Sequence, residues 1–133
     1  MKKILIVTPN VSPIPDVDGG ATENLITILL EENEKYKKNK FYICSKYTNE
    51  ALNESHKFNS TDFFYYKKRS QLNIYEFFTR IFLIIKKSLS YKKYTISNYH
   101  FWALDIAKKI KPDYIIASGG IYENLELFKD TFG

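Results

Sequence analysis

A short, unbroken apolar run near the start of the chain limits the possible folds more than any other feature. Apart from Lys3, residues 3–8 are apolar or β-branched, and no polar residue alternates with them. Such a run is typical of a strand that is buried on both faces, as the strands of parallel sheets are. Similar short runs return later in the chain, at 41–45, 63–66 and 113–117.

Segments with helical features separate these runs. They lie at 21–34, 48–57, 74–87 and 97–110, and we expect a last helix to begin near residue 122. Strands that alternate with helices form βαβ units. We therefore predict a Rossmann-like α/β fold of three layers, in which a mostly parallel sheet lies between helices.

Length and composition exclude several classes of protein. The 133 residues suit one domain, and a hydrophobic content of 44% can offset the entropy lost on ordering, so intrinsic disorder is excluded. Cys44 is the single cysteine, which excludes a disulfide framework, and His56 and His100 are too far apart to suggest a metal site. We expect no metal and no cofactor. The apolar runs are too short for a membrane span or a signal peptide, so we expect a cytoplasmic protein.

Charge is distributed unevenly along the chain. Residues 35–111 carry 17 basic and 5 acidic groups, whereas both ends are acidic. A basic belt of this kind attracts phosphates, nucleic acid or anionic lipid, although a general bias toward lysine explains it equally well. Nucleic acid is disfavoured, because the belt has few arginines and its aromatic residues fall in predicted helices and strands. The apolar and basic segment 74–93 suits peripheral contact with the inner face of a membrane, although core packing is the simpler interpretation.

A glycine pair follows the first predicted strand after a long loop. Residues 9–20 contain three prolines and end in Gly19-Gly20, and an amphipathic helix begins at Ala21, with Leu25, Ile28 and Leu29 at helical spacing. Glycine lets a ligand approach the backbone closely, and the free N–H groups of a helix start attract anions. The loop therefore predicts a phosphate or anion site. The alternative is that the glycines only permit a tight turn.

The opening of the chain resembles a glycosyltransferase. Residues 4–9 (ILIVTP), the proline-containing loop, Gly19-Gly20-Ala21 and the following helix are together similar to the start of family 4 retaining glycosyltransferases, which have the GT-B fold. Within that family, residues 13–21 look closest to bacterial spore-coat and capsular polysaccharide enzymes. Lys111-Pro112-Asp113 before an apolar strand is also similar to the family. Residues 41–110 match it only in the order of their elements.

The resemblance implies a domain organisation and an activity. Enzymes of this family have two Rossmann-like domains, of which the first binds mainly the acceptor and the second binds the nucleotide-sugar donor. Residues 1–133 would form a single, truncated acceptor-side domain with the C-terminal donor-binding domain absent, and the family's Glu-x7-Glu motif is missing. The full-length protein would move a sugar from a nucleotide diphosphate sugar to a polysaccharide or lipid-linked acceptor. This chain alone would be inactive.

The resemblance also implies positions for site residues. Gly19 and Gly20 would lie against the donor diphosphate or the transferred sugar, and Asp16 and Asp18 would edge the cleft, although turn capping is the simpler role for the two aspartates. Ser118 stands where the family often has a histidine, and Gly119 follows it. A serine can hydrogen-bond a sugar hydroxyl but cannot carry an imidazole's charge, so no catalytic residue is assigned.

A non-catalytic role is the second interpretation. The chain would then be a glycosyltransferase-like binding or partner module, which keeps the fold and has lost the catalytic site. The serine at position 118 fits this alternative, because it replaces the residue expected to act in catalysis.

Overall fold

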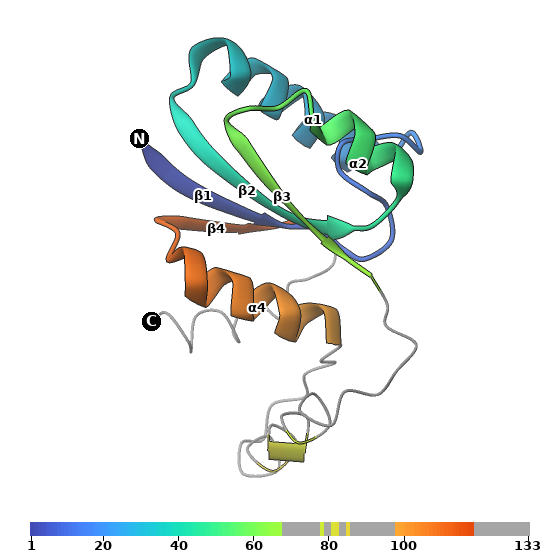
Figure 1. Ribbon diagram of the computed structural model, residues 1–133, viewed down its shortest axis with the longest axis vertical. Helices are drawn as coiled ribbons and strands as arrows, with labels where there is room; N and C mark the ends of the chain where they lie inside the picture. The colour runs from blue at the N-terminus through green and yellow to red at the C-terminus, as the bar shows by residue number, and fades with distance from the viewer. Residues whose placement is uncertain (68–77, 79–80, 83–84, 86–97, 119–133) are drawn as a thin grey trace.

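A computed structural model describes residues 1–67, 78, 81–82, 85 and 98–118 (Figure 1). Its elements are β1 (Lys2–Val7), α1 (Ala21–Tyr36), β2 (Asn39–Lys46), α2 (Asn49–Ser55), β3 (Thr61–Tyr66), α4 (Asn98–Ile110) and β4 (Tyr114–Ala117). The four strands form one parallel sheet in the order β3-β2-β1-β4. The predicted Rossmann-like α/β fold is confirmed.

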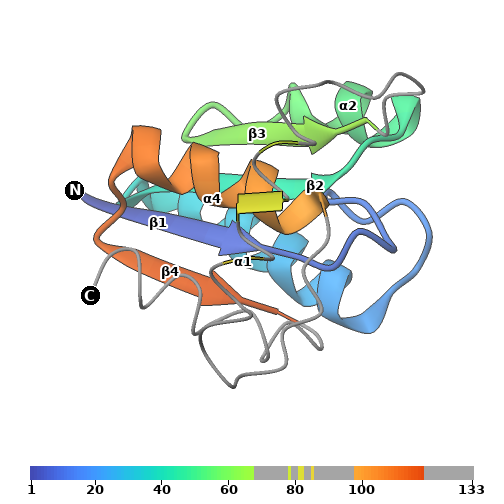
Figure 2. The ribbon, with the colours of Figure 1, turned by 90° about the horizontal axis from the view of Figure 1, so that it is seen from below.

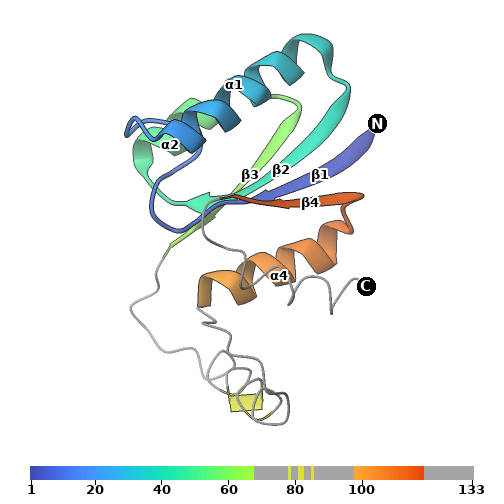
Figure 3. The same cartoon turned by 180° about the vertical axis from the view of Figure 1, so that it is seen from behind.

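Helices lie on both faces of the sheet. Figures 1 and 3 show α1 and α2 on one face and α4 on the other. Because successive side chains of a strand point to opposite faces, β1 contributes to two apolar clusters. Ile6 packs in the cluster below α1, whereas Leu5 and Val7 pack in the cluster against α4. Both faces of β1 are therefore covered, as its unbroken apolar run predicts.

The apolar positions predicted to share a face of α4 do so. Tyr99, Ala103 and Ile106 are buried, and Ile110 packs against the same cluster. The helix carries Lys108 and Lys109 in its last turn, where positive charges stabilise the negative end of the helix dipole. Lys111 then takes a left-handed conformation with φ of 51° before Pro112. The chain turns here into β4.

In α1, the helix is confirmed but its buried face is not the one that the sequence pattern indicates. Leu25, Ile28 and Leu29, which define the predicted apolar stripe, are exposed. Ile26 and Leu30 are buried against the sheet instead. The third buried residue of α1 is polar: Asn33, whose side chain makes hydrogen bonds.

A polar cluster occupies the buried flank of α1 near its C-terminal end. The Asn33 amide nitrogen donates to the Asn39 carbonyl at 2.8 Å and to the Ser60 hydroxyl at 3.0 Å. The Glu34 carboxylate accepts from the Ser60 N–H at 2.6 Å and from the Ser60 hydroxyl. Burial raises the pKa of Glu34, but these hydrogen bonds outweigh it, and the net pKa lies below the ordinary value. The cluster joins the end of α1 to the starts of β2 and β3.

Other expectations are met in part or fall outside the described residues. The short helix expected at 48–57 is α2, and the Thr48 hydroxyl caps it by accepting from the Ala51 N–H at 3.1 Å. Phe78, Ile81, Phe82 and Ile85 are helical and exposed, but most of the helix expected at 74–87 is not described. The helix expected near residue 122 and Gly119 also lie outside the described residues.

Candidate functional site

The order of the strands marks one edge of the sheet as the place for a ligand. In open parallel sheets, ligands bind beyond the carboxyl ends of the strands, at the point where the strand order reverses. Here β1 lies between β2 and β4, so that point falls between β1 and β4. Figure 2 shows these two strands side by side. The loop 8–20 leaves the end of β1, and Ser118 leaves the end of β4.

Ser118 lies beside the first residue of the loop. Val7 pairs with Ala117, and the Ser118 N–H donates to the Val7 carbonyl at 3.0 Å, so Thr8 and Ser118 follow neighbouring strand ends. The Ser118 hydroxyl oxygen is buried and has no hydrogen-bond partner among the residues that the structure describes. A buried hydroxyl without a partner is unusual. Ser118 therefore has the capacity to accept or donate one more hydrogen bond.

Side chains from three elements fix the middle of the loop. The Ile14 N–H donates to the Ser45 hydroxyl on β2 at 2.8 Å, and the Tyr65 hydroxyl on β3 contacts the Ile14 carbonyl at 2.8 Å and the Ala51 carbonyl at 3.0 Å. The Asp16 N–H donates to the Thr27 hydroxyl on α1 at 2.9 Å. Ile14 itself is fully buried below α1. These hydrogen bonds therefore fix the loop to the rest of the fold.

The glycine pair does not offer free amides to a ligand. The Asp16 carboxylate oxygen Oδ1 accepts hydrogen bonds from the N–H groups of Asp18, Gly19 and Gly20, at 3.2, 2.8 and 3.2 Å. Three successive N–H groups that converge on one oxygen form an anion-binding nest. The sequence predicts an anion at this place, and the anion is the chain's own carboxylate. An external phosphate or anion, which the sequence predicts here, would therefore meet amides that are already occupied.

A second carboxylate lies over the start of α1. A Cβ added to Gly20 would lie 2.1 Å from the Glu23 Oε2 atom, so the Glu23 side chain covers the α carbon of Gly20. A negative charge in the first turn of a helix stabilises the positive end of its dipole. Gly19 is different, because its φ of +82° favours glycine and a Cβ there would meet open space. Only Gly19 leaves room for a ligand.

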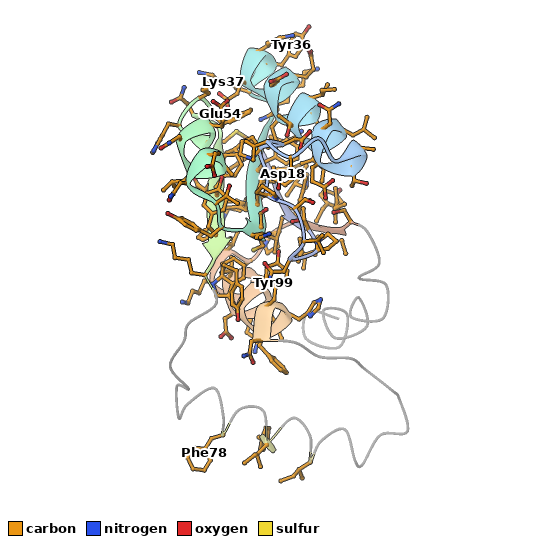
Figure 4. All side chains as sticks on the ribbon, turned by 90° about the vertical axis from the view of Figure 1, so that its right-hand side faces the viewer. Asp18, Tyr36, Lys37, Glu54, Phe78 and Tyr99 are labelled. Atoms are coloured by element: carbon orange, nitrogen blue, oxygen red, sulfur yellow. The ribbon has the colours of Figure 1, made fainter. Side chains whose placement is uncertain are left out.

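The two aspartates have different roles. Asp16 closes the turn, which is the capping role that asparagine and aspartate commonly play. Asp18 is exposed, shortly before α1 begins, and Figure 4 labels it. Among the described residues, no hydrogen bond joins Ser118 to either aspartate or to the glycines. The predicted site residues thus fall in two groups, at the end of β4 and at the start of α1.

Sequence reasoning did not identify a buried hydrogen-bond cluster at this edge of the sheet. The Cys44 carbonyl at the end of β2 accepts from the Thr8 N–H and hydroxyl, both at 3.1 Å, and from the Tyr99 hydroxyl at 2.8 Å. Burial raises the pKa of the Tyr99 phenol, so the hydroxyl keeps its proton. In the sequence, Tyr99 is recognisable only as an apolar helix position. Its hydroxyl ties the start of α4 to the ends of β1 and β2.

The remaining candidate groups are the single cysteine and the two histidines. Cys44 is fully buried, and burial raises the pKa of its thiol to about 12, which makes it inert at neutral pH. Burial lowers the pKa of His100, whereas His56 is exposed. Within residues 1–67 and 98–118, no three metal-ligating side chains come together.

In the described part of the chain, no helix is both long enough and apolar enough to cross a membrane. The fold and its strand order define a Rossmann-like α/β domain, and in such folds ligands bind where the strand order reverses, which here is between the carboxyl ends of β1 and β4. Comparisons of the chain with protein-family models, with curated proteins and with solved structures find no match.

Proposed function

We propose that this chain is the acceptor-side domain of a glycosyltransferase, which moves a sugar from a nucleotide diphosphate sugar to a polysaccharide or lipid-linked acceptor. The resemblance of residues 4–9, 13–21 and 111–113 to family 4 enzymes suggests this activity. One structural observation supports it most. A loop fixed by side chains from three elements leaves β1 at the point where the strand order reverses, next to the unpartnered hydroxyl of Ser118.

The proposed site would bind an acceptor rather than a diphosphate. Asp16 already occupies the amides of Gly19 and Gly20, and Glu23 adds a second negative charge beside them. Two carboxylates repel a phosphate but accept hydrogen bonds from sugar hydroxyls, which are good donors. Ser118 and the open side of Gly19 would contribute a hydroxyl and space for a sugar ring.

A binding experiment tests this proposal, because binding of an acceptor can be measured without turnover. The ¹⁵N-labelled chain is titrated with UDP-glucose and, separately, with a short-chain alkyl disaccharide that carries no phosphate. We expect saturable shifts of the Thr8, Gly19 and Ser118 amides with the disaccharide, and no transfer of glucose. Ser118→Ala should weaken this binding. Shifts confined to residues away from both strand ends would contradict the proposal.

A non-catalytic partner module is the second candidate, and the occupied amides of Gly19 and Gly20 favour it. A module of this kind keeps the fold and binds neither donor nor acceptor. The same titration distinguishes the two candidates, because the module predicts no saturable shift with either sugar compound.

We also propose that the transferase acts at the inner face of a membrane, through the segment 74–93. Phe78, Ile81, Phe82 and Ile85 are helical, lie at i, i+3, i+4 and i+7, and are 38–67% exposed. The segment contains one acidic and five basic residues. Apolar side chains on one helix face beside lysines are typical of helices that bind anionic lipid surfaces.

Vesicle co-sedimentation tests the membrane contact separately from sugar binding. We expect binding to vesicles with anionic lipid, little binding to neutral vesicles, and loss of binding in Phe82→Glu. Val11→Glu is the matched control, because Val11 is 70% exposed and lies in the loop after β1. Equal binding of both variants would exclude this contact.

A further inference from the structure

One end of the fold collects the starts of all the strands in the sheet. The strands are parallel, so they begin at the same end of the sheet. α1, α2 and α4 each lead into the next strand along the chain, so these helices end there as well. Figure 1 shows the start of β1 and the ends of α1 and α4 on the same side of the molecule. We call this end of the fold the amino end.

Most of the lysines that the structure describes lie at the amino end. Lys46 and Lys67 are at the ends of β2 and β3, at the opposite edge of the sheet. All of the other described lysines are at the amino end: Lys2, Lys3, Lys35, Lys37, Lys38, Lys40, Lys57, Lys108, Lys109 and Lys111. The segments outside the described residues join the described chain at the opposite end, after β3, before α4 and after β4. The fold thus gathers basic residues that are spread along the sequence into one surface.

Acidic groups compensate only part of this charge. Ion pairs join Lys2 to Asp113, Lys35 to Glu32, Lys40 to Asp62 and Lys57 to Glu54. Other lysines are exposed and form no ion pair with an acidic group that the structure describes: Lys3, Lys38, Lys108, Lys109 and Lys111. The amino end therefore keeps an excess of positive charge, which attracts anionic surfaces.

Two helices end on a lysine in a conformation that favours glycine. Lys37 caps α1 with φ of 47°, and Lys111 follows α4 with φ of 51°. Glycine is the usual residue at such a position, because a side chain is strained there. The lysine charge offsets part of that strain at the negative end of the helix dipole. Both helices thus place a charge at the amino end where glycine would suit the backbone better.

Tyrosine rings lie among these lysines. Tyr36 is 67% exposed and Tyr114 is 56% exposed. The Lys38 ammonium lies 5.7 Å from the centre of the Tyr36 ring, and the Lys2 ammonium lies 6.0 Å from the centre of the Tyr114 ring. Tyrosine has an apolar ring with a polar tip, and lysine has an apolar stem below its charge. Both side chains therefore suit the boundary between water and lipid.

We propose that the amino end binds the surface of an anionic lipid bilayer. Its lysines lie in three layers, at the end of α1, at the strand starts and at the end of α4. Packed layers are about 10 Å apart. A flat surface can contact all three layers at once, whereas an extended peptide or a single nucleic-acid strand follows one line across them. Each lysine held near an anionic membrane surface adds to the attraction.

The inference deepens the proposed membrane location of the transferase, on which it rests, but it involves none of the residues 74–93. An apolar helix and a separate basic surface are complementary signals, since stable membrane attachment usually takes two. A bilayer at the amino end also leaves the carboxyl ends of β1 and β4 on the aqueous side. The proposed acceptor site would therefore stay accessible to a polysaccharide chain.

Charge reversal at the amino end tests the proposal. Co-sedimentation is measured with vesicles of phosphatidylcholine and phosphatidylserine, and with vesicles of phosphatidylcholine alone. The double variants Lys108→Glu/Lys109→Glu and Lys3→Glu/Lys38→Glu change different layers of the amino end. We expect each to weaken binding to the anionic vesicles by about tenfold or more. The neutral vesicles should bind little of any chain.

The matched control is a double variant at the opposite edge of the sheet. Lys46→Glu/Lys67→Glu makes the same change of charge at the ends of β2 and β3 and should bind anionic vesicles as the wild type does. A loss of binding equal to that of the amino-end variants would show that only the net charge matters, and would overturn the proposal. Circular dichroism shows whether each variant is folded.

The remaining outcomes separate this surface from other contacts. Wild-type binding by both amino-end variants would overturn the proposal even if Phe82→Glu loses binding, because the contact would then be confined to 74–93. Tighter binding of the wild type to a single-stranded DNA oligonucleotide than to anionic vesicles, lost in the same variants, would assign the amino end to nucleic acid and overturn the bilayer. The titration with sugar compounds is independent of these results, because the variants leave the carboxyl ends of β1 and β4 unchanged.

Discussion

The carboxylate of Asp16 accepts a hydrogen bond from the N–H of Gly19 at 2.8 Å, and this contact determines what the glycine pair can do. The same oxygen atom also accepts from Asp18 and Gly20. A chain segment built to surround an anion thus surrounds one of its own side chains. The loop is stable without a ligand, and an external phosphate would have to displace Asp16.

Removal of the Asp16 carboxylate should destabilise the protein. Asp16→Ala leaves three N–H groups without their charged acceptor, and we expect a loss of about 2 kcal/mol in the free energy of unfolding. Urea denaturation measures this loss. Asp18→Ala is the control, since Asp18 is exposed, and should change the free energy by less than about 0.5 kcal/mol. Equal effects of the two substitutions would show that Asp16 does not hold the turn.

The Tyr65 hydroxyl should contribute to stability by fixing the loop to the sheet. It contacts the carbonyls of Ile14 and Ala51, and Tyr65→Phe removes the single O–H that they share. We expect a loss of about 1–2 kcal/mol. In the control Tyr47→Phe, only the hydrogen bond to exposed Asn49 is lost, and the cost should stay below about 0.5 kcal/mol. Thermal unfolding of the two variants gives the comparison, and similar melting temperatures would contradict it.

Glu34 should make stability depend on pH. Its pKa is lower in the folded chain than the ordinary value of 4.5, so the unfolded state binds its proton more readily. The stabilisation is therefore complete above about pH 4.5 and disappears as the pH falls through the lowered pKa. We expect Glu34→Gln to lower the free energy of unfolding by about 1 kcal/mol at pH 7.

The pH profile of that difference is the decisive measurement. The gap between wild type and Glu34→Gln should shrink as the pH is lowered below the ordinary pKa. The control Glu31→Gln, on an exposed position of the same helix, should show little change across this range. A gap that stays constant down to strongly acidic pH would show that the Glu34 charge plays no part.

Two neighbouring leucines should respond differently to truncation. Leu30 is fully buried, and Leu30→Ala should cost about 3 kcal/mol because it removes buried carbon and leaves a cavity. Leu29 is 45% exposed, and Leu29→Ala should cost less than about 1 kcal/mol. Chemical denaturation of the two variants makes this comparison. Reversed costs would show that α1 is rotated from its position here.

The fold could be predicted from the sequence because the strands are short apolar runs and the described helices α1, α2 and α4 lie between them in the chain. The site could be predicted only in part. The pattern Leu25, Ile28, Leu29 identifies a helix but cannot say which flank contacts the sheet, because Asn33 and Glu34 bind polar groups that are distant in sequence. Gly19 and Gly20 indicate an anion site, but whether Asp16 fills it depends on the conformation of the turn.

The most direct test of the proposed site is whether the Gly19 and Gly20 amides can bind an external anion. The ¹⁵N-labelled chain and its Asp16→Ala variant are titrated with inorganic phosphate, with Asp18→Ala as control. We predict no saturable shift of these two amides in the wild type or in Asp18→Ala, and a saturable shift in Asp16→Ala. A saturable shift in the wild type would show that the amides are open to anions and would contradict the assignment of this edge to an acceptor.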